Sequence, residues 1–370
     1  MRVGGRACPI SLVGEEIESP WNAAALADIA ALFGGSYRAY GESSGSPVLP
    51  PAMPRIISDA SALDAQVLTT KTNINSPPIE AIHSFFDYVI AAENAPGAQS
   101  IYSFRPPPTG AAAILVGNEA RGLRPRTLKQ ADAIVEIPLR SRNINCLNVA
   151  AAAAVMLYYL SLDQRLEAKQ TTATAMTRRR PDLLLVGGAD PMELGSTIRS
   201  ACAFGWEHVF LDDPQNAWYE CDRRIKSDGR GAARRGRNPI KVIPHCADRL
   251  AHYRKMVVFT TKSKGRPAWK VPVSSGDVLA VLPDESQSSE AWSPPAEWNG
   301  ELIYALLPES APAQYHYRQM TAIALAEIAR QVGKSTGRGV YLLSKRDRHR
   351  REIPAAASIT SLTLQDLQIF

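Results

Sequence analysis

The stretch Ile114-Leu-Val-Gly-Asn-Glu-Ala-Arg-Gly-Leu123 decides the fold of this 370-residue chain. Its apolar start predicts a strand that is covered on both faces of a parallel sheet. Gly117 lets the backbone approach a ligand closely, and Gly122 permits a second sharp turn. Glu119 places a carboxylate at the carboxyl end of the strand, where open α/β sheets bind their ligands. We therefore expect an α/β domain that holds a small polar ligand at this edge.

Two more segments complete this expected site. Ala133–Pro138 predicts a second buried strand that leads into a loop. A helix is expected from Leu147 to about Leu160, and Asn148 lies in its first turn with side-chain donors and acceptors available. The pattern favours a ligand held mainly through backbone groups.

The same order of elements occurs twice along the chain, which indicates a duplicated domain. In the first half we expect strands at 10–14, 113–117 and 133–138, and helices at 23–33 and 147–160. In the second half we expect strands at 182–187, 277–282 and 301–308, and helices ending at 204 and 332. The segment 167–181 is polar and threonine-rich, as linkers are. We therefore predict two tandem α/β domains, 1–166 and 182–336, with a linker at 167–181 and a basic extension at 337–370.

Composition limits the function classes. Hydrophobic residues make up 45% of the chain and charged residues 21%, which excludes a mostly disordered protein. No apolar run approaches the length of about 20 residues that a membrane span needs, and no secretory signal is recognisable at the start. The five cysteines have no CxxC spacing, so neither a metal site nor a disulfide framework is expected. We expect a cytoplasmic protein without a membrane partner.

The net charge of +6 favours a polyanionic partner, and the positive charge is clustered. A basic loop is expected from Arg223 through Arg230, and the stretch from Gly229 to Arg237 resembles a flexible segment that binds phosphates. The residues expected to contact nucleic acid are Arg178, Arg179, Arg180, Arg230, Arg234, Arg235, Arg237, Lys345 and Arg346. The alternative is that these clusters are solvated surfaces.

The two motifs resemble those of the SpoU/TrmH-like RNA ribose 2′-O-methyltransferases, a branch of the SPOUT superfamily. Gly117, Glu119 and Gly122 match the family's Gly-x-Glu-x-x-Gly loop. The residues that match its Ile-Pro…Ser-Leu-Asn-Val segment are Ile137, Pro138, Leu147, Asn148 and Val149. The chain departs from the family at Cys146, which stands where serine is usual, and in a loop that is one residue longer.

This resemblance implies a deep trefoil knot, an exception to the rule of unknotted chains. It also implies S-adenosylmethionine bound in a bent conformation, and an active site between two domains. The residues expected to hold the cofactor are Val116, Gly117, Asn118, Gly122, Ile137, Leu139, Cys146, Leu147 and Asn148.

The family's first motif, an Asn followed six residues later by Arg, differs between the two halves. The first half has Asn22, but its second position is Asp28. The second half has Glu193 at the first position and Arg199 at the second. Only the second half therefore keeps the arginine that the family uses in catalysis.

The later motifs are lost in the opposite half. Pro283 stands at the position of Gly117, and the motif's second glycine is missing after it. His316 and Arg318 stand at the positions of Cys146 and Asn148. A rigid proline and a bulky arginine would obstruct a cofactor pocket in the second half.

These complementary losses predict one composite site, with Arg199, Asn22 and Glu119 as its catalytic residues. The predicted function is S-adenosylmethionine-dependent 2′-O-methylation of tRNA or rRNA by a monomer that is an internal pseudodimer. Two alternatives stay open: an inactive RNA- or ribosome-binding factor, and a SPOUT enzyme that acts on a small molecule. In a purely structural interpretation, Arg199 would pair within the fold and Glu119 would bind backbone amides.

Overall fold

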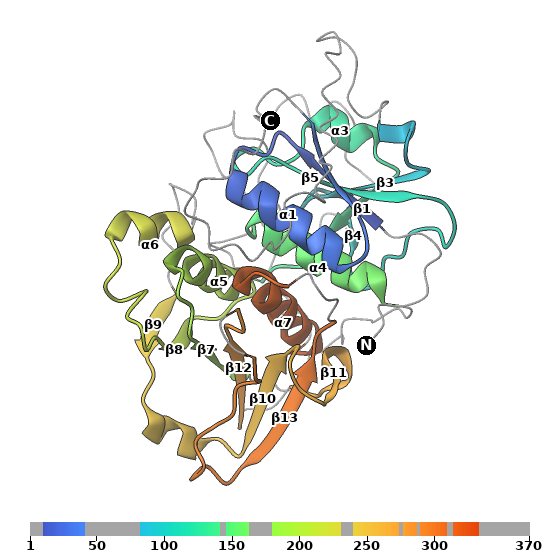
Figure 1. Ribbon diagram of the computed structural model, residues 1–370. Helices are drawn as coiled ribbons and strands as arrows, with labels where there is room; N and C mark the ends of the chain where they lie inside the picture. The colour runs from blue at the N-terminus through green and yellow to red at the C-terminus, as the bar shows by residue number, and fades with distance from the viewer. Residues whose placement is uncertain are drawn as a thin grey trace.

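The protein contains two parallel β-sheets with helices packed between them (Figure 1). The computed structural model describes residues 10–40, 82–140, 146–162, 180–230, 240–273, 277–286, 289–308 and 314–332.

The first sheet is formed by the first half of the chain. Its strands are β1 (Ile10–Glu15), β2 (Tyr37–Tyr40), β3 (Tyr88–Ala92), β4 (Gln99–Ser100), β5 (Ala112–Val116) and β6 (Ala133–Glu136). Every pair is parallel, in the order β2-β1-β5-β3-β6-β4. The helices of this half are α1 (Pro20–Leu32), α3 (Pro125–Gln130) and α4 (Val149–Ser161).

The second sheet is formed by the second half. Its strands are β7 (Asp182–Val186), β8 (His208–Asp212), β9 (Lys241–Pro244), β10 (Lys255–Thr260), β11 (Arg266–Pro267), β12 (Val278–Pro283) and β13 (Glu301–Leu306). They pair in parallel in the order β11-β13-β10-β12-β7-β8-β9. The helices are α5 (Pro191–Ala203), α6 (Arg223–Arg230) and α7 (Tyr317–Val332), with 3-10 turns η2 (Ala247–His252) and η3 (Ala268–Lys270).

The two sheets share one strand order. Read from its other edge, the second sheet runs β8-β7-β12-β10-β13-β11, which repeats the first sheet position by position, with β9 added beside β8. The predicted α/β class with parallel sheets and flanking helices is therefore confirmed. Each strand and helix expected from the sequence is present, with bounds that differ by one to three residues in most cases.

One expectation about the second half is wrong. The sequence predicted that the arginine-rich segment from Arg223 is a loop, whereas Arg223–Arg230 is the helix α6. Asp222 starts it, since its carboxylate accepts from the backbone N–H of Arg224 over 2.6 Å. This local capping outweighs the density of positive charge that suggested a flexible segment.

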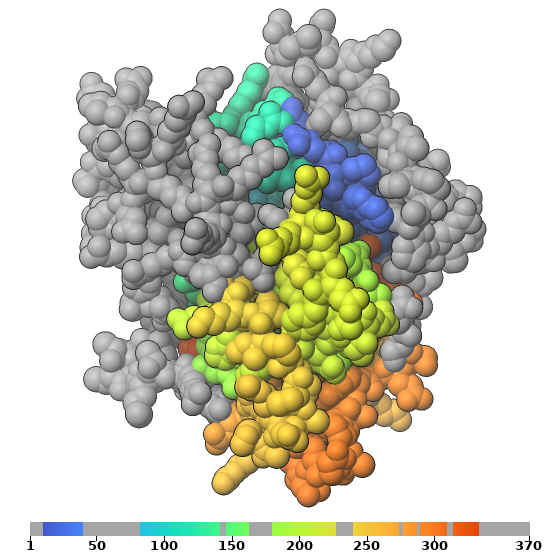
Figure 2. All heavy atoms as spheres, turned by 90° about the vertical axis from the view of Figure 1, so that its left-hand side faces the viewer, coloured from blue at the N-terminus to red at the C-terminus, as the bar shows by residue number. Residues whose placement is uncertain are grey.

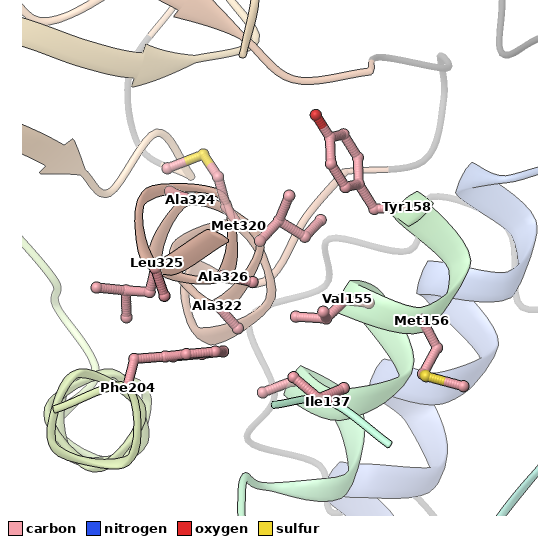
Figure 3. Packing of buried hydrophobic residues seen from close by; sticks show 14 of the residues in the cluster. Ile137, Val155, Met156, Tyr158, Phe204, Met320, Ala322, Ala324, Leu325 and Ala326 are labelled. Carbon is pink, nitrogen blue, oxygen red and sulfur yellow. The ribbon is translucent and has the colours of Figure 1, made fainter. Parts of the chain in front are cut away.

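Helices α1, α4, α5 and α7 lie between the two sheets and share one hydrophobic core with their inner faces. Figure 3 shows Ala322 and Ala326 of α7 facing Val155 of α4, and Leu325 beside Phe204 at the end of α5. All sixteen residues of α7 are buried, polar ones included. A helix buried on every side is typical of the centre of a large core.

A buried carboxylate links α7 to α4 across this core. Glu327 is fully buried, and its Oε2 accepts from the Tyr159 hydroxyl over 2.8 Å. The Arg330 guanidinium pairs with the same carboxylate, and Gln331 Nε2 donates to its Oε1 over 2.9 Å. The charge of Glu327 is thus compensated within the protein, as a buried charge must be.

None of the described helices is both long and apolar enough to cross a membrane.

Removal of the Tyr159 hydroxyl tests this link. We expect Tyr159→Phe to lower the free energy of unfolding by about 1–3 kcal/mol, because Glu327 would lose a buried donor. Tyr158→Phe is the matched control, since the Tyr158 hydroxyl does not bind Glu327. Urea unfolding followed by circular dichroism measures both variants. Equal losses in the two would contradict the role given to the Tyr159–Glu327 bond.

Candidate active site

Three polar side chains of the first half form one cluster at the carboxyl end of the first sheet. Asn22 Nδ2 donates to Glu119 Oε1 over 2.9 Å, and Asn148 Nδ2 donates to Asn22 Oδ1 over 3.0 Å. We call Asn22, Glu119 and Asn148 the amide cluster. Residues from α1, from the loop after β5 and from the start of α4 thus meet as the motifs predicted.

Two members of the amide cluster, Glu119 and Asn148, also hold backbone in place. Glu119 accepts from the backbone N–H groups of Glu18 and Ser19, each over 3.0 Å. Asn148 is the N-cap of α4, and its Oδ1 accepts from Ala150 N over 2.9 Å. Glu119 thus binds backbone amides, as the purely structural interpretation expected. Its carboxylate fixes the start of α1 and orients Asn22.

The loop after β5 depends on two glycines. A Cβ on Gly117 would lie 2.2 Å from the carbonyl carbon of Gly122, so only glycine allows this approach. Gly122 has a φ of 70°, a conformation that favours glycine. Asn118 closes the turn, because its Oδ1 accepts from Ala120 N and Arg121 N over 2.9 and 3.1 Å.

Carboxylates missed by the sequence analysis brace this loop. Glu93, which follows β3, accepts from Leu123 N over 3.0 Å and lies against Gly122. Burial raises the pKa of Glu93, although hydrogen bonds from Leu123 and Asn94 act in the opposite direction. Glu16 pairs with the exposed Arg121 over 3.0 Å. Isolated glutamates in loops carry no spacing signal, so only the structure reveals their role.

Arg199 reaches this region from the second half of the chain. Its Nη2 lies 2.8 Å from Cys146 Sγ, and its Nε donates to Cys146 O over 3.3 Å. Nη2 also lies 3.4 Å from Leu147 O. Arg199 therefore contacts the two residues that precede Asn148, although it belongs to α5.

The loop after β6 is also attached to the second half. Arg140 N donates to Ala203 O over 2.9 Å, and the Arg140 guanidinium donates to Ala329 O. Burial and the nearby Arg180 lower the pKa of Arg140 to about 10. Leu139, a predicted cofactor contact, is therefore fixed next to a residue that binds both α5 and α7.

A second cluster is formed by the residues at the equivalent motif positions with the two halves exchanged. His316 Nε2 lies 2.8 Å from Asp28 Oδ2, and its Nδ1 lies 3.6 Å from Glu193 Oε1. Arg318 Nη1 lies 3.2 Å from the same Glu193 oxygen, and Arg318 N donates to Glu193 Oε2 over 2.9 Å. We call Asp28, Glu193, His316 and Arg318 the ion cluster.

The ion cluster is poorly accessible and shifts the pKa of its members. Burial lowers the pKa of His316, but hydrogen bonds to Asp28 and Glu193 outweigh it and raise the pKa to about 9. Burial raises the pKa of Glu193, while Arg318 and His316 outweigh it and hold that pKa below its usual range. At neutral pH the cluster therefore contains two positive and two negative charges.

The two clusters correspond position by position. Asn22 contacts Asn148 in one, and Glu193 contacts Arg318 in the other. Arg199 contacts Cys146 in one, and Asp28 contacts His316 in the other. The substitutions noticed in the sequence are thus matched in pairs, because each new charge has an opposite charge beside it.

The cavity beside the ion cluster is small. It measures about 60 Å³ and is lined in part by Lys262, Glu285, Gln314 and Tyr315. Glu285 accepts from Thr261 N and Thr261 Oγ1 over 3.0 and 2.9 Å. Ligand pockets of drug-sized molecules measure roughly 300–1,000 Å³. Among the described loops of the second half, this cavity is too small for a nucleoside cofactor.

The corresponding loops of the first half offer a different set of groups. Leu139 and Leu147 are half-buried apolar side chains at the edge of the core, and Val116 and Ile137 are buried behind them. Asn118 and Asn148 use their side-chain oxygens within the protein. This set of groups fits a ligand that is held by apolar contact and by backbone groups.

Most residues predicted to contact RNA lie outside the described residues. These are Arg178, Arg179, Arg234, Arg235, Arg237, Lys345 and Arg346. Arg230 ends α6 in the described backbone. Arg180 is bound inside the fold: it donates to Gly205 O and stacks over Trp206, with 5.7 Å from its guanidinium carbon to the ring centre. We therefore leave Arg180 out of the RNA surface.

Residues 9–158 match the model of the SpoU rRNA Methylase family. The first half of the chain is therefore similar to SpoU methylases. SpoU methyltransferases use S-adenosylmethionine, and the matched range contains the whole amide cluster. No curated protein matches the chain.

Several solved structures of SpoU proteins are similar to this chain. The TrmH/SpoU tRNA modifying enzyme of A. aeolicus is 16% identical, with a TM-score of 0.32 over 42% of this chain and 77% of its own. AviRb of Streptomyces viridochromogenes, in complex with AdoMet, is 18% identical, with a TM-score of 0.30 over 45% and 66%. An AdoMet-bound rRNA methyltransferase of Sinorhizobium meliloti is 15% identical, with a TM-score of 0.29 over 55% and 74%.

The protonation of His316 predicts a pH dependence of stability. Its folded pKa of about 9 exceeds its unfolded value, so the stabilisation is complete below about pH 6.5 and is lost as the pH rises through 9. We expect the free energy of unfolding to fall by about 1–3 kcal/mol over this window. In His316→Gln this slope should flatten, as measured by urea unfolding at several pH values.

His208→Gln is the control, since His208 is more exposed and pairs with Asp182 over 3.6 Å at the other edge of the second half. It should keep the wild-type slope. An unchanged slope in His316→Gln would show that His316 does not hold its proton in the folded protein.

Proposed function

We propose that this protein transfers a methyl group from S-adenosylmethionine to a ribose 2′-oxygen of RNA, at one composite site between its two halves. The contact of Arg199 with Cys146 and Leu147 carries the proposal. It joins the arginine of one half to the cofactor motif of the other. The match of residues 9–158 to the SpoU family supports the chemistry.

The cofactor would be held by the first half. Val116, Gly117, Ile137, Leu139 and Leu147 offer apolar side chains and backbone groups there, and Asn148 fixes the loop that carries Leu147. When bound, S-adenosylmethionine supplies an electrophilic methyl group on its sulfonium. In the proposed transfer the methyl group would exchange its bond to sulfur for a bond to the 2′-oxygen, and the hydroxyl proton would leave to solvent or to a neighbouring phosphate.

Arg199 is the residue placed to act on the RNA. A guanidinium gives up its proton too reluctantly to act as a base, so the role of Arg199 is electrostatic: it holds a phosphate and the 2′-hydroxyl as charge develops on the oxygen. Asn22 and Glu119 would orient the hydroxyl or the loop around it. Binding two reactants in a fixed geometry supplies much of the rate of such reactions.

Exposed side chains beside the site suit an RNA partner. The indole of Trp21, next to Asn22, is 43% exposed and offers a flat surface on which an unpaired base can stack. Arg223 and Arg224 are exposed on α6, which packs against α5 and lies at the surface (Figure 2). These arginines would contact phosphates.

The shared strand order of the two sheets supports an internal pseudodimer. We propose that the boundaries expected from the sequence separate two SPOUT-like domains, and that the protein acts as a monomer on tRNA or rRNA. The second half would have given up its own cofactor site and kept its arginine for the first.

A methyl-transfer assay tests the proposal. Total RNA is incubated with the protein and labelled S-adenosylmethionine, and the modified nucleotide is mapped. Arg199→Ala should lower the rate about 10²–10³-fold, by analogy with other groups that stabilise developing negative charge. The Kd for the cofactor should stay within twofold of wild type.

Arg266→Ala, at an exposed arginine on β11, is the matched control and should keep full activity. Full activity in Arg199→Ala would refute the composite site. RNA binding without methyl transfer by the wild type would favour an assembly factor, and transfer to a small molecule alone would favour the third class.

Cofactor stoichiometry is a second, independent prediction. We expect one S-adenosylmethionine per chain in isothermal titration calorimetry, because the cavity beside the motif loop of the second half, lined in part by Lys262, Glu285 and Tyr315, measures only about 60 Å³. Gly117→Val should abolish this binding, since a side chain there meets the backbone of Gly122. Gly265→Val, at a comparable close approach in the second half, should leave cofactor binding unchanged if the chain still folds. Two equivalent sites would contradict the prediction.

A further inference from the structure

Helix α1 contributes to both clusters, and helix α5 contributes to the ion cluster and carries Arg199 beside the loop that precedes Asn148. Asn22 and Asp28 lie six residues apart on α1, and Glu193 and Arg199 lie six residues apart on α5. Six residues of helix span about 9 Å. A movement of either helix along its own axis would therefore displace a residue of the ion cluster together with Asn22 or Arg199.

The ion cluster is built to hold these helices. His316 Nε2 binds Asp28 of α1 over 2.8 Å, and Arg318 Nη1 binds Glu193 of α5 over 3.2 Å. The side chains of all four residues are at most 22% exposed. Since His316 and Arg318 both come from the start of α7, this one helix is fixed to α1 and to α5 by charge.

Two more bonds extend from α7 to the backbone around Asn22. Arg318 Nη2 donates to Trp21 O over 3.2 Å, and Gln319 Nε2 donates to Ala25 O over 2.7 Å. Trp21 precedes Asn22 directly, and Ala25 lies one turn after it. The ion cluster thus fixes the helical turn from which Asn22 reaches Glu119 and Asn148.

Arg199 depends on the same helix placement. Its contacts are to Cys146 and Leu147, which belong to a loop of the opposite half. A guanidinium on a long side chain keeps this position only if α5 stays fixed relative to that loop. Glu193, one and a half turns earlier on α5, is where the ion cluster fixes the helix.

We infer that Asp28, Glu193, His316 and Arg318 are positioning residues of the proposed methyl transfer, which hold Arg199 and Asn22 at the opposite site. This inference rests on the proposed function. The second half would then contribute the ion pairs that fix the helices, in addition to Arg199. Misplacement of a reacting group by about 1 Å can cost on the order of 10²-fold in rate, so the loss of these ion pairs has a measurable effect.

The test uses the full chain with Glu193→Gln, which keeps the shape of the side chain and removes its charge. We expect kcat to fall about tenfold or more, while the Kd for S-adenosylmethionine stays within twofold. Glu301→Gln is the matched control: it removes a glutamate charge from an exposed pair with Lys255 in the same half, over 3.8 Å. That variant should keep the wild-type kcat.

A second measurement reports on Arg199 without any methyl transfer. Cys146 is exposed and lies against the Arg199 guanidinium, so its alkylation by iodoacetamide depends on where that guanidinium is. The rate at Cys146 is followed by peptide mass, with the exposed Cys246 as internal reference. Arg199→Ala calibrates the rate for a thiol without this neighbour, and Arg199→Lys gives an intermediate reference.

In Glu193→Gln we expect the alkylation rate of Cys146 to change from the wild-type value by at least half of the change that Arg199→Ala causes. The alkylation rate of Cys246 should stay unchanged. Asp28→Asn should act in the same direction, since it removes the other anion that faces His316. We expect kcat of the wild type to decline above about pH 9 and His316→Gln to lack this decline, because only the protonated ring can donate to both Asp28 and Glu193.

A wild-type alkylation rate at Cys146 in Glu193→Gln and Asp28→Asn would overturn the inference, whether or not the protein methylates RNA. If these rates shift while the wild type methylates no RNA, the proposed function fails and the positioning of Arg199 by the ion cluster stands. A general loss of structure is recognised by a parallel change at Cys246.

Discussion

The structure depends on the burial of α7 between the two halves. This helix has no face left for solvent, and its Glu327 carboxylate must find donors on neighbouring elements. Tyr159 of α4 and Arg330 of α7 supply them. Because this contact joins the last described helix to the last helix of the first half, it fixes the relative position of both sheets. The residues of both clusters lie on or next to the helices between the two sheets, so the packing of these helices sets the geometry of the clusters.

Much of the fold could be predicted from the sequence. The apolar runs at β1, β5 and β7 are continuous, as buried parallel strands require, and the helices α1 and α5 begin at clear capping residues. The sequence analysis expected only three strands in each half and missed the others, which are β2, β3, β4, β8, β9, β10 and β11. Of these, the edge strands β4 and β11 have only two residues each and no periodic pattern. The knot stays a prediction.

The site could be predicted only in part. The motif glycines and Asn148 were recognisable because the backbone needs them at fixed spacing. Glu93, Glu16 and the pairing of Asp28 with His316 depend on contacts between distant segments, which residue spacing does not encode. Arg318 looks like a loss of the motif when the second half is considered alone. The structure explains it, because Arg318 pairs with Glu193 and donates to the backbone of Trp21 in the first half.

The position of α7 in the chain has a consequence for synthesis on the ribosome. The apolar surface of α4 is completed long before α7 is translated, and until then nothing from the second half can cover it. Exposed apolar surface of this kind attracts other chains or chaperones. A nascent chain paused between the halves would therefore be prone to aggregation, and the later synthesis of α7 decides whether the apolar surface of α4 becomes covered.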